Sequence, residues 1–258
     1  MRKNSICLIG CGWLGLPLAK SLIEAGHNVS VTTATDRYTE LLNLGIHSEI
    51  LDLSQSPSLL QSHLNADVII YTIPPLDPQY ISDYLEQLPK DKKIIFTSST
   101  SVYSKNSGQI NEEKLLEEKT SQSPVLVKTE HFLLSKFKNI TILRLGGLYG
   151  LKRHPLYFLQ GRKNVAGANE YLHLVHLDDC VQAISQVLNL NQWGEIFNIV
   201  SDLRISKKLY YHFMAEKMKL PPPEYTIDTS VMDQQTNISN EKSKILLKIN
   251  YLDPKNYI

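Results

Sequence analysis

Short apolar runs alternate with longer amphipathic stretches along the first part of the chain. Several of these runs carry almost no polar residue, which is typical of strands whose two faces are both covered by helices. The alternation therefore predicts a parallel sheet in an α/β fold. The predicted strands are Ser5–Gly10, Asn28–Thr33, Ser48–Leu53, Asp67–Ile73, Lys93–Ser98 and Ile140–Leu145.

The stretches between these runs place apolar residues at helical spacing, as Leu14, Leu18 and Leu22 do. Gly26 follows the first of them, where a helix is expected to end. The predicted helices are Leu14–Ala25, Arg37–Leu44, Ser58–Asn65, Pro78–Leu88 and Pro124–Lys136.

After Gly150 the regular alternation of strand and helix patterns ends, and residues typical of loops predominate. Further elements are expected at His173–Leu177 (strand), from Asp178 or Asp179 (helix), at Ile196–Val200 (strand), and at Lys207–Lys219 and Glu241–Leu247 (helices). We therefore expect a Rossmann-type doubly wound parallel sheet, with a nucleotide-binding core over residues 1–150. Residues 151–258 are expected to form a small carboxy-terminal substrate portion, of which residues 173–200 return to the core.

A glycine-rich turn follows the first predicted strand and opens the first predicted helix. Its pattern is G-x-G-x-x-G. In this pattern the first glycine allows a tight turn, the second lets the backbone approach a pyrophosphate, and the third lets helix and strand pack closely. The helix N-terminus adds free N–H groups and partial positive charge. The alternative is a glycine-rich turn that holds no ligand. The cofactor-binding candidates here are Gly10, Cys11, Gly12, Trp13, Leu14 and Gly15.

The end of the second strand bears on which dinucleotide is bound. NAD-binding domains usually place an acidic residue there, for the 2′-hydroxyl of the ribose. Here the strand ends at Thr32 and Thr33 without a carboxylate, and Arg37 follows closely enough to pair with a 2′-phosphate. The expected cofactor is therefore NADP (or NAD), with NADPH bound more tightly than NADH. The alternative is that Arg37 belongs to the first turn of an exposed helix that Asp36 caps.

Composition and net charge indicate which partners the protein is expected to bind. The chain has 258 residues, 42% of them hydrophobic, and a net charge of +1 without a basic stripe. We therefore expect a small-molecule substrate, no nucleic-acid or membrane partner, and a monomer or homodimer. The cysteines Cys7, Cys11 and Cys180 lack metal-ligand spacing and are expected to be reduced thiols. No signal peptide or membrane span is evident, so the protein is expected to be cytoplasmic.

Several loose motifs follow one another in a recognisable order. The fifth predicted strand ends in S-S-x-x-V-Y, at residues 98–103, and Asp52-Leu53 follows the third strand. Further along come R-x-x-x-x-Y-G at residues 144–150, H-L-V-H-L-D-D at residues 173–179, and F-N-I at residues 197–199. Together they resemble the extended short-chain dehydrogenase/reductases, the NAD-dependent epimerase/dehydratase group, over essentially the whole chain.

The resemblance implies catalytic roles for some residues and leaves one role without a residue. Ser99 matches the serine or threonine that hydrogen-bonds the substrate oxygen. The Y-x-x-x-K pair would fall near Gln122 and Leu126, where no tyrosine is present, and Lys128 is the only ammonium nearby. Tyrosine acts in such pairs as a general acid/base with its pKa moved toward neutrality. The chain is therefore most similar to the small G-x-G-W-L-G group that lacks this pair.

The remaining candidates rest on their positions near the carboxyl edge of the sheet. Tyr103 and Tyr149 are substitutes for the missing acid/base, although a half-buried aromatic lining is the alternative for both. The resemblance assigns cofactor contacts to Asp52 and Leu53, and we add Thr72, Ile73, Pro74 and Ser98. Candidates for substrate contacts are Thr100, Arg153, His154 and His176. No metal site is expected, because His173 and His176 lack a third ligand.

Two functions remain open. The first is an NAD(P)-dependent oxidoreductase or epimerase/dehydratase-like enzyme that acts on a small polar substrate, with sugar-linked compounds among the candidates. The second is a non-catalytic NADP-binding sensor or regulatory module that lost its proton donor. A closed apolar space beside Ser99 favours the sensor, whereas an open pocket that receives Arg153 or a tyrosine hydroxyl favours the enzyme.

Overall fold

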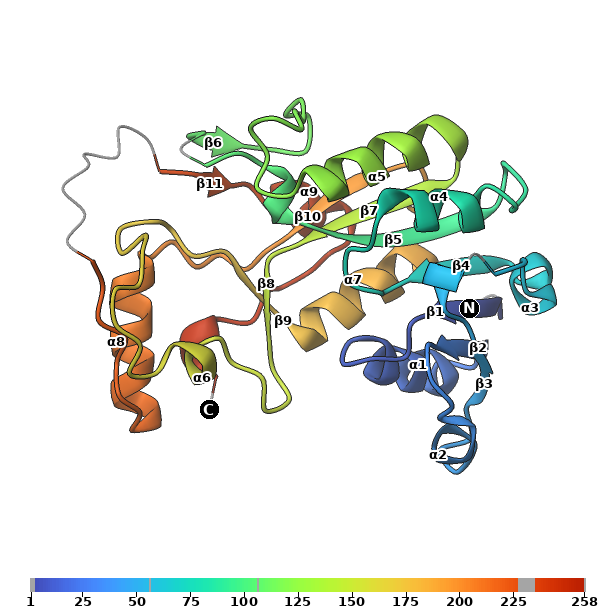
Figure 1. Cartoon of the computed structure of the whole chain (residues 1–258), viewed down its shortest axis with the longest axis horizontal. Coiled ribbons are helices and arrows are strands. Elements are labelled where there is room, and N and C mark those ends of the chain that lie inside the picture. The colour runs from blue at the N-terminus through green and yellow to red at the C-terminus, as the bar shows by residue number, and fades with distance from the viewer. Residues whose placement is uncertain (1–2, 56, 106, 227–234, 258) are drawn as a thin grey trace.

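A seven-stranded sheet forms the centre of the molecule (Figure 1). The computed structural model describes residues 3–55, 57–105, 107–226 and 235–257. All neighbouring strands of the sheet run parallel, in the order β10-β7-β5-β4-β1-β2-β3. This order confirms the predicted Rossmann-type doubly wound fold. The strands are β1 (Ser5–Ile9), β2 (Asn28–Thr33), β3 (His47–Ile50), β4 (Val68–Tyr71), β5 (Lys93–Ser99), β7 (Ile140–Leu145) and β10 (Ile196–Ile199).

Helices cover both faces of the sheet (Figure 1). On one face α1 (Gly15–Glu24) and α7 (Leu177–Asn189) pack side by side and bury their apolar stripes against the strands. On the other face α4 (Pro78–Leu85) and α5 (Pro124–Lys136) do the same. The short helices α2 (Tyr38–Leu42) and α3 (Gln61–Asn65) complete the connections. Two hydrophobic cores result, one on each side of the sheet.

The predicted boundaries agree well with the structure where the local signals are strong. β2, β7 and α5 begin and end at the predicted residues, and α5 has Pro124 in its first turn, where proline is favoured. The start of α7 differs from the prediction. It begins at Leu177, and the Nδ1 atom of His176 accepts the Asp178 N–H, so a histidine rather than an aspartate caps this helix.

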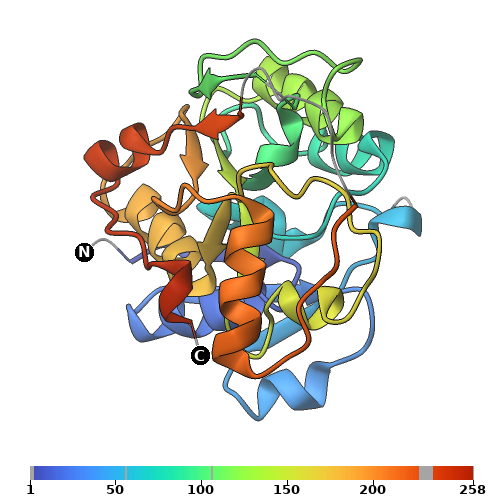
Figure 2. The same cartoon turned by 90° about the vertical axis from the view of Figure 1, so that its left-hand side faces the viewer.

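The carboxy-terminal portion adds a third hydrophobic core, which includes Tyr149, Tyr210 and Met214. Figure 2 shows α8 (Lys207–Met218) in front of the sheet, with α6 (Leu156–Leu159) close to it. Two small parallel pairs join distant segments: β8 with β9 and β6 with β11. The remaining bounds are β6 (Gln109–Ile110), β8 (Gly147–Tyr149), β9 (Leu174–His176), β11 (Asn237–Ile238), α9 (Glu241–Leu246) and the 3₁₀ turns η1 (Leu53–Gln55), η2 (Thr100–Val102) and η3 (Pro254–Asn256).

The parallel arrangement gathers functional candidates at one edge of the sheet. The glycine turn follows β1 and Ser99 ends β5, and these two strands flank β4. Ligands of doubly wound folds bind outside the carboxyl ends of the strands.

The described helices include none with the length and apolarity needed to cross a bilayer.

Candidate functional site

The glycine turn is held in place by the strands on both sides of it. The Thr72 hydroxyl donates to the Gly10 carbonyl oxygen at 2.6 Å, and the Cys11 N–H donates to the Thr32 carbonyl oxygen at 2.9 Å. Gly10 has φ of +99°, in the region that favours glycine. A Cβ atom on Gly15 would lie 2.0 Å from the Gly10 carbonyl oxygen, so only glycine allows the helix to start this close to the strand.

Gly12 has a different environment from the other two glycines. A Cβ atom built there meets no atom within 4 Å, so open space lies beside the backbone at the tip of the turn. The N-terminus of α1 follows directly. Space for a ligand, exposed backbone and a helix N-terminus are the features that a dinucleotide pyrophosphate requires. The residues present therefore fit the expected cofactor.

Other residues of the turn pack into the protein. Cys11 and Leu14 are buried in the core, and burial raises the pKa of the Cys11 thiol. All three cysteines are free and buried. Ile73 lies against Gly10, since a Cβ atom there would come within 2.7 Å of its Cγ1. Ile73 thus borders the turn on the side of β4, and Pro74, which follows it in the chain, is exposed.

Arg37 connects the end of β2 to the glycine turn. Its Nη1 donates to the Cys11 carbonyl oxygen at 2.7 Å, while Nε and Nη2 donate to both Glu40 carboxylate oxygens at 2.8 and 2.6 Å. The Thr33 hydroxyl donates to the Thr35 carbonyl oxygen at 2.6 Å. The guanidinium therefore lies beside the place where the adenosine ribose is expected, with a carboxylate partner already present.

Asp52 and Leu53 lie at the carboxyl end of β3. Asp52 is half-buried and accepts hydrogen bonds from the N–H and the hydroxyl of Ser54, which lower the pKa of its carboxyl group. Leu53 is 2% exposed and belongs to the core. In this structure the Asp52 carboxylate shapes the turn at η1.

Arg153 reaches the glycine turn from the loop after β8. Its guanidinium carbon lies 4.9 Å from the centroid of the Trp13 ring. A tight turn positions it, because Gly150 and Arg153 exchange both backbone hydrogen bonds, at 2.8 and 2.7 Å. The two residues between them, Leu151 and Lys152, have φ of 38° and 60°, a conformation that is strained for side chains other than glycine.

A cavity of about 330 Å³ lies beside Ser99. Ser99 accepts the Ser101 N–H at 3.2 Å through its hydroxyl oxygen and caps the short turn that contains Thr100. Both residues line the cavity, and so does Gln122, at the expected position of the missing tyrosine. The remaining lining includes the apolar residues Leu172 and Ile238 together with charged and polar groups from distant segments, among them Lys105, Glu170, Tyr171, His173, Lys207, Gln235 and Thr236.

The charged residues of this cavity are paired with one another. Glu170 forms ion pairs with Lys105, at 2.9 Å, and with Lys207, and these lysines hold the pKa of its carboxyl group low against the opposing effect of burial. Lys207 is the first residue of α8 and Lys105 follows η2. Sequence patterns do not reveal this cluster, because its members lie on three segments far apart in the chain.

Tyr103 borders the cavity, but its hydroxyl is engaged in the protein interior. It donates to Asn198 Oδ1 at 2.8 Å and accepts from Arg144 Nη1 at 2.8 Å. Burial raises the pKa of this tyrosine. Arg144 also pairs with Glu130 at 2.7 Å, and Glu130 accepts the Ser98 hydroxyl at 2.5 Å. Tyr103 and Ser98 thus belong to a buried network below the site.

The two other candidates for the acid/base lie away from the cavity lining. Tyr149 is 1% exposed, its hydroxyl lies 3.4 Å from the Leu252 carbonyl oxygen, and burial raises its pKa. Lys128 lies on the surface of α5, where its Nζ is 3.5 Å from a Glu118 carboxylate oxygen. Neither residue lines the cavity beside Ser99.

His154 and His176 contribute to the packing of the carboxy-terminal portion. His154 is fully buried, contacts the Tyr210 hydroxyl at 3.0 Å and stacks on Tyr257 with ring centroids 5.2 Å apart. Burial lowers its pKa to about 4. His176 caps α7 and lies edge-on to Tyr149 at 4.9 Å. Neither is among the residues lining the cavity beside Ser99. No group of metal-binding side chains occurs among the described residues.

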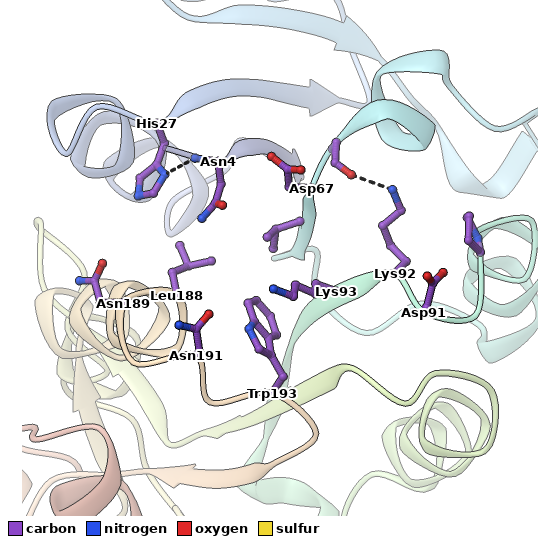
Figure 3. Close-up of a pocket in the computed structure, with 13 residues that line it drawn as sticks. Asn4, His27, Asp67, Asp91, Lys92, Lys93, Leu188, Asn189, Asn191 and Trp193 are labelled. Carbon is purple, nitrogen blue, oxygen red and sulfur yellow. Dashed lines mark hydrogen bonds between the residues drawn. The ribbon is translucent and has the colours of Figure 1, made fainter. Parts of the chain in front are cut away.

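A second cavity, of about 440 Å³, lies at the opposite edge of the sheet (Figure 3). Asn4, Asp67 and Lys93, which stand at the amino ends of β1, β4 and β5, line it. Asp67 accepts the Ser5 N–H at 2.8 Å, and the Lys93 ammonium lies 5.1 Å from the Trp193 ring centroid. Asp67 and Lys93 thus already have partners, and the cavity lies at the end of the strands opposite to the glycine turn.

Comparisons with known proteins agree with this arrangement. Residues 5–122 match a family model described as the NAD binding domain of 6-phosphogluconate dehydrogenase. Protein YeeZ of Escherichia coli (strain K12) is 32% identical over 240 residues, which cover 86% of each chain.

Solved structures share the fold at low sequence identity. UDP-glucuronic acid 4-epimerase from Bacillus cereus, in complex with NAD, has a TM-score of 0.73 at 20% identity and covers 97% of this chain and 92% of its own. MoeE5 in complex with UDP-glucose and NAD has a TM-score of 0.72 at 17% identity and covers 96% and 93%. The order of the sheet and the glycine turn fit both comparisons. The chain therefore belongs to the family of protein YeeZ, it has the fold of the NAD-bound epimerase structures, and its cofactor is NAD(P).

Proposed function

We propose that the protein is an NAD(P)-dependent enzyme of the epimerase/dehydratase or reductase type, acting on a small polar substrate linked to a nucleotide or sugar. The observation that carries this proposal is the cavity beside Ser99, which lies at the same sheet edge as the glycine turn and has both polar and apolar lining residues. The cavity contains hydroxyls, two amides and paired charges, which are groups that can bind and orient a polar substrate. A cavity with these groups supports the enzyme over the sensor, although Arg153 does not line it and the hydroxyl of the bordering Tyr103 is engaged in the interior.

The residues of the chain have separate tasks in this proposal. Gly12 and the N-terminus of α1 bind the pyrophosphate, and Arg37 binds the 2′-phosphate of NADP by exchanging one of its Glu40 contacts. When bound, the nicotinamide supplies hydride transfer. Ser99 orients the reacting oxygen of the substrate, with Thr100 beside it.

The carboxy-terminal portion completes the substrate cavity. Glu170, His173 and Lys207 all come from residues 151–258, and they face Ser99 and Lys105 of the nucleotide-binding part across the cavity. We therefore propose the division into a nucleotide-binding core over residues 1–150 and a substrate portion over residues 151–258. Glu170 and the two lysines offer both acceptors and donors, which suits a substrate with several hydroxyl groups.

Two measurements test the proposal. Calorimetric titration with NADPH and NADH should show binding of at least one, and NADPH should bind more tightly. The protein is then incubated with cofactor and UDP-glucose, UDP-glucuronic acid or UDP-N-acetylglucosamine, and the products are separated by chromatography. Turnover of one of these that is lost in Ser99→Ala supports the enzyme, whereas nucleotide binding without any turnover or substrate binding contradicts it.

A further inference from the structure

We infer that His173 donates a hydrogen bond to the substrate oxygen at the reacting centre and shares, with Ser99, the task that the missing tyrosine leaves open. This inference rests on the proposed function and names a further residue of the same site. It begins from the position of His173 in the cavity beside Ser99.

A pair of glycines brings His173 to the sheet edge. Ser99 of β5 is the register partner of Leu145 of β7, and Gly146 and Gly147 follow Leu145 at once. The Gly147 N–H donates to the His173 carbonyl oxygen at 2.7 Å. A Cβ atom on Gly146 would lie 2.9 Å from the same oxygen, so a larger residue there would push His173 away.

The hydrogen bonding of the imidazole determines which nitrogen carries the proton. The Ile238 N–H donates to His173 Nε2 at 3.4 Å. A neutral imidazole has one donor and one acceptor nitrogen, so the proton is on Nδ1 when Nε2 accepts. His173 thereby offers an N–H donor while its other nitrogen is held by β11.

The surroundings keep this imidazole neutral. Burial lowers the pKa of His173 to about 4, and the positive charges of Arg204 and Lys207 act in the same direction. The carboxylate of Glu170, in the same cavity, is paired with Lys105 and Lys207. A neutral donor of fixed tautomer can polarise a carbonyl or orient a hydroxyl without gaining or losing a proton.

Other side chains named for this task are less suited to it. The Tyr103 hydroxyl is engaged by Asn198 and Arg144, and neither Tyr149 nor Lys128 lines the cavity. Gln122 stands where the tyrosine of the resemblance would be, but its amide Nε2 donates to the Tyr103 carbonyl oxygen at 3.2 Å. His173 therefore combines access to the cavity with a directed donor.

Three substitutions separate a catalytic donor from a structural contact. The side-chain amide of asparagine reaches the position of Nδ1, and that of glutamine reaches the position of Nε2. His173→Asn should keep kcat/KM for the nucleotide sugar that the wild type turns over within about threefold. His173→Gln and His173→Ala should lower it by about tenfold or more, as expected for the loss of one directed hydrogen bond. If His173→Gln keeps the wild-type kcat/KM and His173→Asn loses it, only the contact with Ile238 matters, and the inference is overturned.

A second measurement is independent of turnover. Nitrogen-15 spectra of the histidine side chains, assigned with the His173→Gln variant, should show the proton on Nδ1 at neutral pH. A proton on Nε2, or a doubly protonated ring, overturns the inference whatever the substrate. Absence of binding and turnover for all three nucleotide sugars overturns the proposed substrate class together with this role, whereas equal kcat/KM in the three variants overturns the role of His173 alone.

Discussion

The guanidinium of Arg153 stacks on the indole of Trp13, with its central carbon 4.9 Å from the ring centroid. This contact joins the loop after β8 to the glycine turn and so connects the two parts of the chain next to the expected position of the cofactor. A cation–π contact of this kind contributes about 0.5 to 2 kcal/mol. Arg153→Gln should therefore weaken NADPH binding by a few-fold and speed its dissociation in stopped-flow fluorescence. The exposed Arg162, changed to Gln, serves as the control, and equal dissociation rates in both variants would exclude a role for the stacking.

The glycine turn allows two functions of glycine to be separated. Gly15→Ala places a methyl group 2.0 Å from the Gly10 carbonyl oxygen, so we expect a lower melting temperature and loss of nucleotide binding. Gly12→Ala meets no protein atom within 4 Å and should leave the melting temperature unchanged while reducing the affinity for NADPH. Calorimetry and thermal melts measure both effects. Undiminished affinity in Gly12→Ala would mean that the ligand does not approach the turn there.

Arg37 should determine the preference between the two dinucleotides. Hydrogen bonds to charged groups contribute about 1.5 to 3 kcal/mol, so Arg37→Gln should weaken NADPH binding by about tenfold or more and leave NADH nearly unaffected. Lys20→Gln, which removes an exposed cation from α1, is the matched control. Tighter binding of NADH than of NADPH by the wild type would contradict the prediction at the outset.

The buried ion pair between Arg144 and Glu130 should be important for stability. Both side chains are almost completely inaccessible to solvent, at 3% and 0% exposure, so Glu130→Ala leaves a buried guanidinium without its carboxylate. Breaking such pairs costs about 3 to 5 kcal/mol. The exposed pair of Glu86 and Lys136 provides the contrast, and Glu86→Ala should cost less than about 1 kcal/mol. Urea denaturation measures both, and a small loss in Glu130→Ala would show that the network relaxes or admits water.

Buried histidines should make the protein sensitive to mild acid. The pKa values of His63, His154 and His173 are lowered to about 4, mainly by burial, against 6.5 for the free side chain. Their contribution to the free energy of unfolding is complete above pH 6.5 and is lost as the pH falls toward 4, because the unfolded chain takes up protons first. Each histidine accounts for at most about 1.4 kcal/mol per pH unit in this window.

His154→Gln tests this prediction, since glutamine can still reach the Tyr210 hydroxyl. The variant should lose less stability between pH 7 and pH 5 than the wild type does, as measured by urea denaturation. His131 lies exposed on α5, and His131→Gln should reproduce the wild-type dependence. Asp179 has the opposite effect on stability. Burial raises the pKa of its carboxyl group to about 6, so the folded protein takes up this proton before the unfolded chain does and is stabilised as the pH falls. If the free energy of unfolding of His154→Gln falls with pH as steeply as that of the wild type, His154 does not contribute to the acid sensitivity.

Much of the fold was predictable because its signals are local. The strand Ile140–Leu145 is rich in β-branched and other apolar residues and is buried throughout, and Pro124 marks the start of α5. The glycine turn and Arg37 were also found from spacing alone. The start of α7 was not, because the capping role of His176 depends on the orientation of its imidazole toward Asp178.

The cavity beside Ser99 was the part that local patterns could not reveal. Its lining joins Ser99 to Lys105, Glu170, His173 and Lys207, which lie on segments far apart in the sequence. The engagement of the Tyr103 hydroxyl has the same origin. Its partners Asn198 and Arg144 lie on β10 and β7, far away in the sequence. The cavity lining and the hydrogen bonds of the Tyr103 hydroxyl both depend on tertiary contacts, so residue type alone does not predict them.

The position of β10 has a consequence for any attempt to isolate the nucleotide-binding part. β10 comes from residues 196–199 but pairs with β7, whose six residues are all buried. A fragment that stops near residue 150 would leave the whole backbone edge of β7 unpaired and would uncover the apolar face that α7 protects. Unprotected edges of this kind recruit other chains and lead to aggregation. A shortened protein would therefore be expected to precipitate, however complete its glycine turn is.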